Sequence, residues 1–312
     1  MAPRTVVSSS DGAAMTVADF MANPLFIPTK LKKLLANQFI AEALLRDGGA
    51  NVSGVFAYRE GDPSFLLDDI DDLAEFAEIT VSTAARGIPK VVFSTKKGKG
   101  IRVTLDMKRK NQVDDVNKQI TALKNSFIRT NDRSIKALFE SIPSFPVSTA
   151  WDVVNSRPRR DIADGIYEIG KAAPTVDQGG SEDEGYEFQA NTIVMNPALE
   201  PILLDNDDLL KVYRGNIADQ NIAYRGALGD RIGNLDIIRS RAWPMDKVLL
   251  LERKTIGFYG DARPLTITEL YPEGNGPNGG PRETWRSDAT QERGAALDQP
   301  QAGLWLTGVT TP

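Results

Sequence analysis

The chain has 312 residues, of which 41% are hydrophobic and 25% are charged, and its formal net charge is −5 at pH 7. This is the balance of a folded globular protein, and the acidic charge excludes a molecule whose whole surface binds polyanions. The chain contains no cysteine and no histidine, which excludes disulfides, iron–sulfur clusters, cysteine-rich zinc sites and catalysis by Ser-His-Asp or Cys-His groups.

The first residues are small, polar and irregular. Residues 1–27 lack the continuous apolar run of a secretory signal, and no later stretch approaches the roughly 20 apolar residues that cross a bilayer. We expect an extended arm with one helical turn after Met15, in an intracellular protein without a membrane segment.

A helix is predicted over residues 29–46. Thr29 can cap it, and Leu31, Leu35 and Leu44 recur near helical spacing. The run Asp47-Gly48-Gly49 is expected to end the helix, and residues 51–58 read as a strand.

Charge is strongly segregated in the next 50 residues. Residues 60–85 contain eight acids and no base, and residues 86–110 contain nine bases and one acid, Asp106. Within the basic half, KVVFS and IRVTLDM are predicted to form a β-hairpin around a turn at residues 97–100. A long acidic excursion would therefore leave the body of the protein, and a basic hairpin would re-enter it.

A long helix is predicted over residues 111–142. Asn111 can cap it, Val113, Val116 and Ile120 begin a 3-4 apolar spacing, and Pro143 ends it. At 1.5 Å per residue the helix would be about 45 Å long, with one polar face throughout. Such a helix is a strut.

The remaining chain mixes helices and strands without a regular βαβ alternation, which favours an α+β fold. We predict a helix near residues 161–169, a buried strand over residues 192–195, and a turn at Asn196-Pro197 into a helix over residues 198–204. Further strands are predicted in four segments: residues 237–242, 247–255, 283–291 and 303–309.

The acidic and basic runs allow several interpretations. Residues 68–72 could bind a divalent cation, but they lack the glycine and terminal glutamate of a helix–loop–helix calcium site, so we predict no metal and no cofactor. The basic run could bind nucleic acid or simply be a solvated face. A third interpretation is that the two runs meet between neighbouring copies, where complementary charge would guide assembly. The residues of this hypothetical interface are Glu60, Asp62, Asp68, Asp69, Asp71 and Asp72 on the acidic side, and Lys96, Lys97, Lys99, Arg102, Lys108 and Arg109 on the basic side.

Several segments, taken in this order, resemble tailed-phage major capsid proteins of the Hong Kong ninety-seven type, and most of all those of actinobacteriophages. The segments are FAYREGDPSFLLDDID, RVTLDMKRKNQVDDVNKQITALKNSFIRT, TIVMNP and SRAWPMDKVLLLERKTIGFYGDARPL. The resemblance spans nearly the whole chain. It implies a fold with an N-terminal arm, an extended β-loop, a long spine helix, a peripheral domain and an axial domain.

The resemblance also implies boundaries and a function. Residues 1–49 would be the arm and first helix, residues 50–88 the extended loop, residues 89–148 and 256–312 the peripheral domain with spine helix 111–142, and residues 149–255 the axial domain. The protein would be a structural protein and not an enzyme. It would assemble in the host cytoplasm into hexamers and pentamers, and these would form the icosahedral capsid of a virion around double-stranded DNA, bound without sequence preference. Its partners would be itself, a portal and possible decoration proteins.

Two departures from the family pattern matter. The founding member cross-links its shell through a loop lysine, but here no lysine lies between Lys33 and Lys90, so we predict a shell without covalent links. Only Lys90, Lys96, Lys97 and Lys99, at the base of the loop, could supply the amine. The family's long N-terminal scaffolding segment is also missing from this sequence, which implies a separate scaffolding protein. The alternatives are an encapsulin-like nanocompartment shell and, more remotely, a carboxylate-based enzyme.

Overall fold

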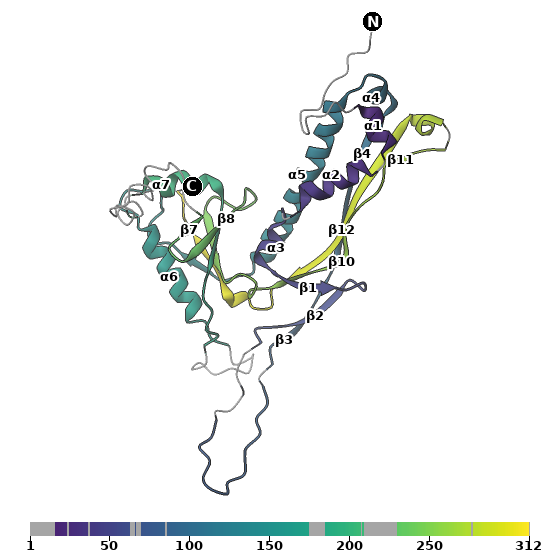
Figure 1. The fold of residues 1–312 in the computed structure, drawn as a ribbon. Helices are drawn as coiled ribbons and strands as arrows, with labels where there is room; N and C mark the ends of the chain where they lie inside the picture. The colour runs from purple at the N-terminus through teal and green to yellow at the C-terminus, as the bar shows by residue number, and fades with distance from the viewer. Residues whose placement is uncertain are drawn as a thin grey trace.

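A computed structural model describes residues 16–311, except residues 24, 37, 63–65, 67–69, 85, 175–184, 207, 209–229 and 276. Two lobes, each built around its own sheet, are joined by one long helix, and an extended loop projects from the base of the molecule (Figure 1). Most of the predicted arm and the acids Asp68 and Asp69 lie outside the described residues. The α+β class predicted from the sequence is confirmed.

The first lobe contains a five-stranded sheet covered on one side by helices. Its strands are β1 (Arg46–Ala50), β4 (Thr95–Thr104), β10 (Phe258–Ile267), β11 (Tyr271–Pro272) and β12 (Thr284–Ala296). Its helices are α1 (Val17–Ala22), α2 (Phe26–Leu35), α4 (Leu105–Arg109), α5 (Val113–Phe139) and the 3-10 helix η4 (Pro277–Arg282). Strand β12 pairs antiparallel with β10 on one edge and with β4 on the other. The strand predicted over residues 283–291 and the short helix after Met15 are thereby confirmed, whereas β10 was not predicted.

The prediction of a basic β-hairpin is wrong in both its strand pairing and its turn. Strand β4 runs straight through residues 97–100, and it pairs with β12 nearly 200 residues later in the sequence. The KVVFS segment forms β3 (Ile88–Phe93), which pairs with β2 (Val55–Glu60). The glycines allow close packing and do not make a turn: a Cβ on Gly98 would lie 3.1 Å from the Thr290 methyl, and a Cβ on Gly100 would overlap the Asp288 carboxylate.

The helix predicted over residues 29–46 is divided into three elements. Helix α2 ends at Leu35, a second helix, α3 (Ile40–Leu44), follows, and β1 begins at once. Leu35 and Phe39 pack in the core of the first lobe but Ile40 packs in that of the second, so the chain turns between them. Gly48 does not mark the end of a helix either. It lies in β1, where a Cβ would be 2.8 Å from the Phe258 ring.

The prediction of a long helix is confirmed, but the helix is shorter at both ends than predicted. Helix α5 has 27 residues and is preceded by the separate short helix α4. Asn111 does not cap α5: its backbone has φ 50°, and its side-chain oxygen accepts a hydrogen bond from the Val17 N–H (2.9 Å). The first turn carries Asp114 and Asp115 and the last turn Lys136, which is the favourable order for the helix dipole.

The second lobe contains a six-stranded sheet in the order β5-β13-β9-β6-β8-β7. These strands are β5 (Ser144–Pro146), β6 (Thr192–Met195), β7 (Arg231–Ile232), β8 (Leu235–Arg239), β9 (Lys247–Leu251) and β13 (Gly303–Thr307). Its helices are α6 (Pro158–Gly170), α7 (Glu200–Asp205) and the 3-10 helices η2 (Pro197–Leu199) and η5 (Pro300–Ala302). Every residue of β6 is buried, as expected for its apolar run, and the Asn196 side chain accepts from the Ala198 N–H (3.0 Å) to start the helical turn. The elements predicted in this region are confirmed, but the strands predicted to end at residues 242, 255 and 309 end at Arg239, Leu251 and Thr307, and β5 and β7 were not predicted.

Strand pairing crosses the predicted division of the chain. Strand β13 pairs with β9 and β5, so both β13 and β5 belong to the sheet of the second lobe. The predicted division places residues 144–146 and 303–307 with the first. The chain therefore passes between the lobes more often than the sequence indicated.

Helix α5 spans two hydrophobic cores with a polar joint between them. Leu123 and Phe127 pack in the first core, and Ile135 and Phe139 pack in the second. A core next to a helix is normally lined by apolar side chains, yet the buried residues between these two groups are Asn131 and Asp132.

The Asp132 carboxylate lies buried at this joint. Its Oδ2 accepts a hydrogen bond from the Ser240 hydroxyl (3.2 Å), and its Oδ1 has no hydrogen-bond partner among the described residues. Burial raises the pKa of Asp132, and the hydrogen bonds from Ser240 and from the Ile40 backbone oppose that shift only in part. Burial at this position therefore favours the neutral, protonated form of the side chain over the charged form.

Replacing Asp132 by Asn should therefore change how stability depends on pH. The raised pKa means that the folded protein binds this proton more tightly than the unfolded chain does, so the stability contributed by Asp132 falls as the pH rises above about 4. We expect the free energy of unfolding of Asp132→Asn, relative to the natural protein, to rise over that window by about 1.4 kcal/mol per unit of pKa shift and then level off. Urea unfolding of unassembled subunits from pH 4 to 8 measures this difference, and a constant difference would contradict it.

Candidate assembly surfaces

The extended loop is carried by a separate two-stranded sheet. Strands β2 and β3 pair antiparallel from Val55↔Phe93 to Glu60↔Ile88, and residues 61–87 leave from their ends. Beyond the sheet, the two arms of the loop meet at one antiparallel bridge, Leu66↔Ala84. Nothing regular follows in residues 70–83, which lie beyond the body of the molecule (Figure 1).

Polar contacts hold the base of the loop to the body of the molecule. The Gly87 N–H donates to Asp62 Oδ1 (2.8 Å), and the Gln299 side chain donates to the Asp62 backbone oxygen (3.0 Å). The Tyr186 hydroxyl, from the second lobe, donates to the Gly61 oxygen (3.1 Å). Lys90 and Glu60 form an ion pair across the two strands. The base is therefore held in place, and the loop leaves the body in a set direction.

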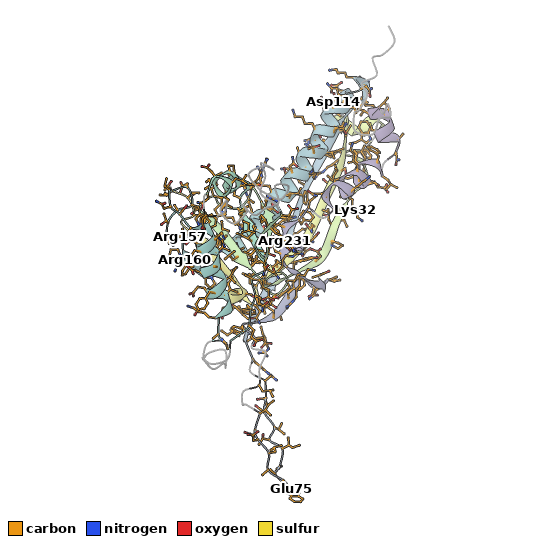
Figure 2. All side chains as sticks on the ribbon, turned by 60° about the vertical axis from the view of Figure 1, so that its left-hand side comes forward. Lys32, Glu75, Asp114, Arg157, Arg160 and Arg231 are labelled. Atoms are coloured by element: carbon orange, nitrogen blue, oxygen red, sulfur yellow. The ribbon has the colours of Figure 1, made fainter. Side chains whose placement is uncertain are left out.

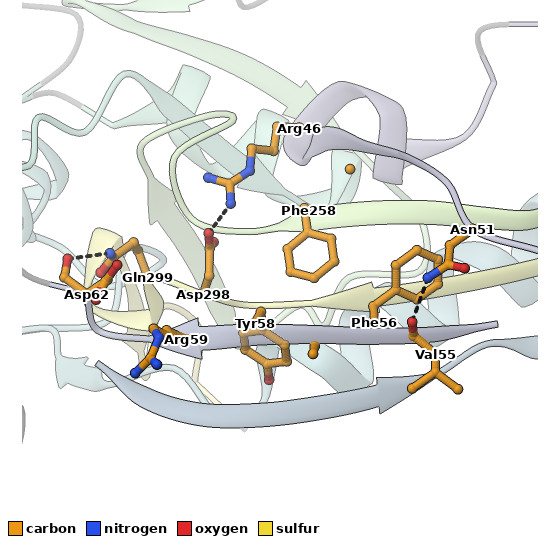
Figure 3. A pocket seen from close by; sticks show the side chains of 12 residues that line it. Arg46, Asn51, Val55, Phe56, Tyr58, Arg59, Asp62, Phe258, Asp298 and Gln299 are labelled. Atoms are coloured by element: carbon orange, nitrogen blue, oxygen red, sulfur yellow. Dashed lines mark hydrogen bonds and ion pairs between the residues drawn. The ribbon is translucent and has the colours of Figure 1, made fainter. Parts of the chain in front are cut away.

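An open groove of about 650 Å³ lies beside this base (Figure 3). Arg46 pairs with Asp298 across it, and the Tyr58 and Phe258 rings meet edge to face with centroids 5.6 Å apart. Burial raises the pKa of Asp298, and Arg46 opposes that shift only in part. The ion pair connects β1 to the segment after β12, and the ring contact packs β2 on β10.

The outer part of the loop exposes apolar side chains. Ile70 is 95% exposed, Phe76 99% and Val81 93%. Phe76 has φ 69°, a conformation that a bulky residue rarely adopts, and it lies beside Glu75 at the far end of the loop (Figure 2). Isolated exposed apolar residues are ordinary, but several on one projecting segment indicate an interaction surface.

The predicted acids fall into two groups. Glu60 and Asp62 are engaged at the base of the loop, as described above. Asp71 accepts a hydrogen bond from the Thr80 hydroxyl (2.8 Å), and Asp72 is exposed. Asp68 and Asp69 lie outside the described residues.

The predicted bases also divide. Lys97 donates to Ser134 Oγ (2.6 Å) and Asn131 Oδ1 (3.3 Å) of α5, and burial together with the charge of Arg293 lowers its pKa. Arg102 forms a bidentate pair with Glu273 (2.6 and 2.9 Å), and the Lys108 ammonium lies 5.9 Å from the centre of the Trp285 ring. Exposed side chains are found at Lys96, Lys99 and Arg109.

No ion pair within the described residues joins an acid of the loop to a base of β4 or α4. Lys97 and Arg102 are already bound within their own chain, so Lys96, Lys99 and Arg109 are the better candidates to meet a second copy. Sequence reasoning overlooked the apolar loop residues, although the alternation of Ile70, Leu73, Phe76 and Ile79 with acids is visible in the sequence.

Other kinds of site are not supported by the described residues. Their carboxylates form no group of three or more that could hold a metal ion. No helix among them is long and apolar enough to cross a membrane.

Comparisons with known proteins bear on these surfaces. A family model described as phage capsid protein matches residues 88–302, which is more than half of the chain. Curated proteins give no match to this sequence.

Solved structures share the fold at low sequence identity. A chain of Microbacterium phage Oxtober96 is 12% identical, with a TM-score of 0.60 and coverage of 86% of this chain and 90% of that one. The virus-like particle from Pyrococcus furiosus is 13% identical, with a TM-score of 0.55 and coverage of 90% and 97%. The capsid of the cyanophage P-SCSP1u is 11% identical, with a TM-score of 0.55 and coverage of 86% of each chain.

Proposed function

Because the chain belongs to the phage capsid protein family, we propose that copies of it assemble through hexamers and pentamers into an icosahedral shell that encloses double-stranded DNA. The observation that carries the proposal is the projecting loop, whose apolar side chains have no partner surface in a single described chain. Burying such side chains against a neighbour is the main driving force for association. The protein is a structural component of the virion.

The finer assignments follow the same proposal. We place residues 50–88 over an adjacent subunit, residues 89–148 and 256–312 in a peripheral domain, and residues 149–255 in an axial domain, apart from the two strands that cross between lobes. The subunit would assemble in the host cytoplasm with a portal and a separate scaffolding protein, and decoration proteins could bind its outer face.

A second candidate is a nanocompartment shell that encloses protein. The structural similarity to the virus-like particle from Pyrococcus furiosus extends over 97% of that chain, and this similarity is the observation that favours the second candidate. A shared fold does not decide the contents of a shell.

Electron microscopy and gradient sedimentation of the purified protein test the proposal. Closed icosahedral particles, or pentamers and hexamers, would support it, and nuclease-protected DNA in particles from the native source would distinguish it from the nanocompartment. A denaturing gel of those particles should show a single-chain band, since the outer loop contains no lysine. A homogeneous monomer at every salt concentration would contradict the proposal.

The charge hypothesis gives a separate prediction. Replacing Asp68, Asp69, Asp71 and Asp72 together by Asn should impair assembly, most visibly at low protein concentration and low salt. Single exposed ion pairs contribute about 0–1 kcal/mol each, so only the combined change should be measurable. Light scattering during assembly, at several ionic strengths, measures the effect.

The matched control removes four exposed acids elsewhere. It combines Asp205→Asn, Asp246→Asn, Glu269→Gln and Glu283→Gln, which changes the net charge equally. If both quadruple variants assemble like the natural protein at all ionic strengths, the acids of the loop are only a solvated face.

A further inference from the structure

One face of helix α5 carries a strip of basic residues. Positions 118, 122, 125, 129, 133 and 136 follow one another at intervals of four, three, four, four and three residues, which keeps them on one stripe of a helix. The residues of this basic strip are Lys118, Ala122, Asn125, Arg129, Arg133 and Lys136. They lie opposite the apolar stripe that packs on the sheet.

The charges of the strip are accessible. Lys118, Arg129 and Arg133 are exposed and Lys136 is half-buried, and none of them forms an ion pair within the described part of the chain. From 118 to 136 the strip is about 27 Å long at 1.5 Å per residue. The exposed acids nearest to the strip along the chain lie at its two ends, Asp114 (Figure 2) with Asp115 at one and Glu140 at the other, whereas Asp132 is buried on the core side of the helix. A protein of net charge −5 therefore has four cations, and no acid between them, on one stripe of its longest helix.

The side chains between the charges indicate what kind of partner fits. The strip contains no aromatic and no branched apolar side chain, and its neutral members are Ala122 and Asn125. Protein interfaces are centred on buried apolar or aromatic anchors, which this strip does not offer. The apolar side chains of the loop, Ile70 and Phe76 among them, would find no matching surface here. A row of flexible cations without stacking groups matches a phosphate backbone.

We propose that the basic strip of α5 faces the enclosed double-stranded DNA and contacts its phosphates without reading bases. This inference rests on the proposed function and assigns it an inner face. Four cations along about 27 Å can each neutralise a phosphate, so binding would be independent of sequence and sensitive to salt. The acidic remainder of the subunit would keep the total attraction weak.

DNA binding by unassembled full-length subunits tests the proposal. A fluorescein-labelled 30-base-pair duplex is titrated with protein at several salt concentrations, and anisotropy is measured. The test variant combines Lys118→Gln, Arg129→Gln, Arg133→Gln and Lys136→Gln. The control combines Arg157→Gln, Arg159→Gln, Arg241→Gln and Lys247→Gln, four exposed bases of the second lobe.

We expect the strip variant to lose about tenfold or more in affinity at 50 mM salt. The magnitude of the slope of log affinity against log salt should fall by up to about 3.6, which is about 0.9 for each of the four lost phosphate contacts, while the control variant keeps most of its affinity and of its salt dependence. Equal losses in the two variants would overturn the proposal, as would no measurable binding by the natural protein. It would also be overturned if a peptide of residues 61–87, and not the duplex, lost its binding to the strip variant, because the strip would then meet a neighbour's loop.

Filled particles give a second measurement that does not depend on the quadruple variant. The chain has no cysteine, so Ala122→Cys provides a single site for a benzophenone maleimide, and Val154→Cys, on the second lobe, is the control. Irradiation should attach DNA to the label at position 122 and not to the control. Particles that form and hold DNA but give no attachment at position 122 would overturn the inference alone, whereas a natural protein that forms no particles would contradict the proposed function.

Discussion

Replacing Arg293 by Met should destabilise the unassembled subunit by about 3 kcal/mol. The guanidinium joins three elements: it donates to both oxygens of Asp261 on β10 (2.7 and 2.9 Å) and to Glu42 of α3 (3.1 Å). It also lies 4.5 Å from the centre of the Tyr259 ring, and the side chain is only 10% exposed. Met fills the space but leaves two carboxylates facing each other without a cation. The value is at the low end of the range for buried pairs because Asp261 and Glu42 keep some contact with water.

The cause of the loss can be isolated with two further variants. Adding Asp261→Asn and Glu42→Gln to Arg293→Met should recover much of the stability, because the uncompensated charges are removed. Arg263→Met, an exposed arginine of β10, should change the free energy of unfolding by less than about 0.5 kcal/mol. Urea unfolding measures all of them, and an Arg293→Met variant within 1 kcal/mol of the natural protein would show that this cluster does not hold α3 to the sheet.

Replacing Phe76 by Ala should leave the subunit as stable as before and strongly impair its assembly. The side chain is 99% exposed, so its removal costs the isolated fold less than about 0.5 kcal/mol. If Phe76 is an anchor of the contact between copies, its loss should cost about 2 kcal/mol or more, which raises the concentration needed for assembly about 30-fold. The measurements are thermal unfolding of subunits and light scattering of assembly against protein concentration.

The control for this variant is Val52→Ala. Val52 is 91% exposed but lies on the short connection between β1 and β2, away from the loop. It should alter neither stability nor assembly. If Phe76→Ala assembles at the same concentration as the natural protein, the tip of the loop is not an anchor, and the apolar side chains nearer its base would have to carry the contact.

The candidate surfaces were only partly accessible to prediction. The acidic loop was found because its charges are consecutive in the sequence, and consecutive charge is visible without a structure. The partners of the bases could not be predicted in this way, because Lys97 bonds to α5 and Arg102 bonds to Glu273 next to β11, both far away in the chain. The strip on α5 has a regular spacing, but its significance depends on knowing which side of the helix the sheet covers.

The elements that the sequence determined by itself are those with a strong local pattern. Residues 113–139 repeat apolar side chains every three or four positions, and residues 192–195 form an apolar run followed by Asn196-Pro197, so each specifies its own conformation. The projecting loop belongs with them, since its consecutive charges oppose burial in its own chain.

Only the tertiary structure decided the roles of the glycines and of the polar residues in α5. Gly98 and Gly100 suggest a turn when only the neighbouring residues are considered. They lie in a straight strand because β4 pairs with β12, almost 200 residues later, and the Thr290 and Asp288 side chains of β12 occupy the space next to them. Asn131 and Asp132 look like an interruption of a helix, yet they are buried where α5 passes from one core to the other. In both cases the deciding contact joins segments that are distant in sequence, and its free energy outweighs a local preference of about 1 kcal/mol.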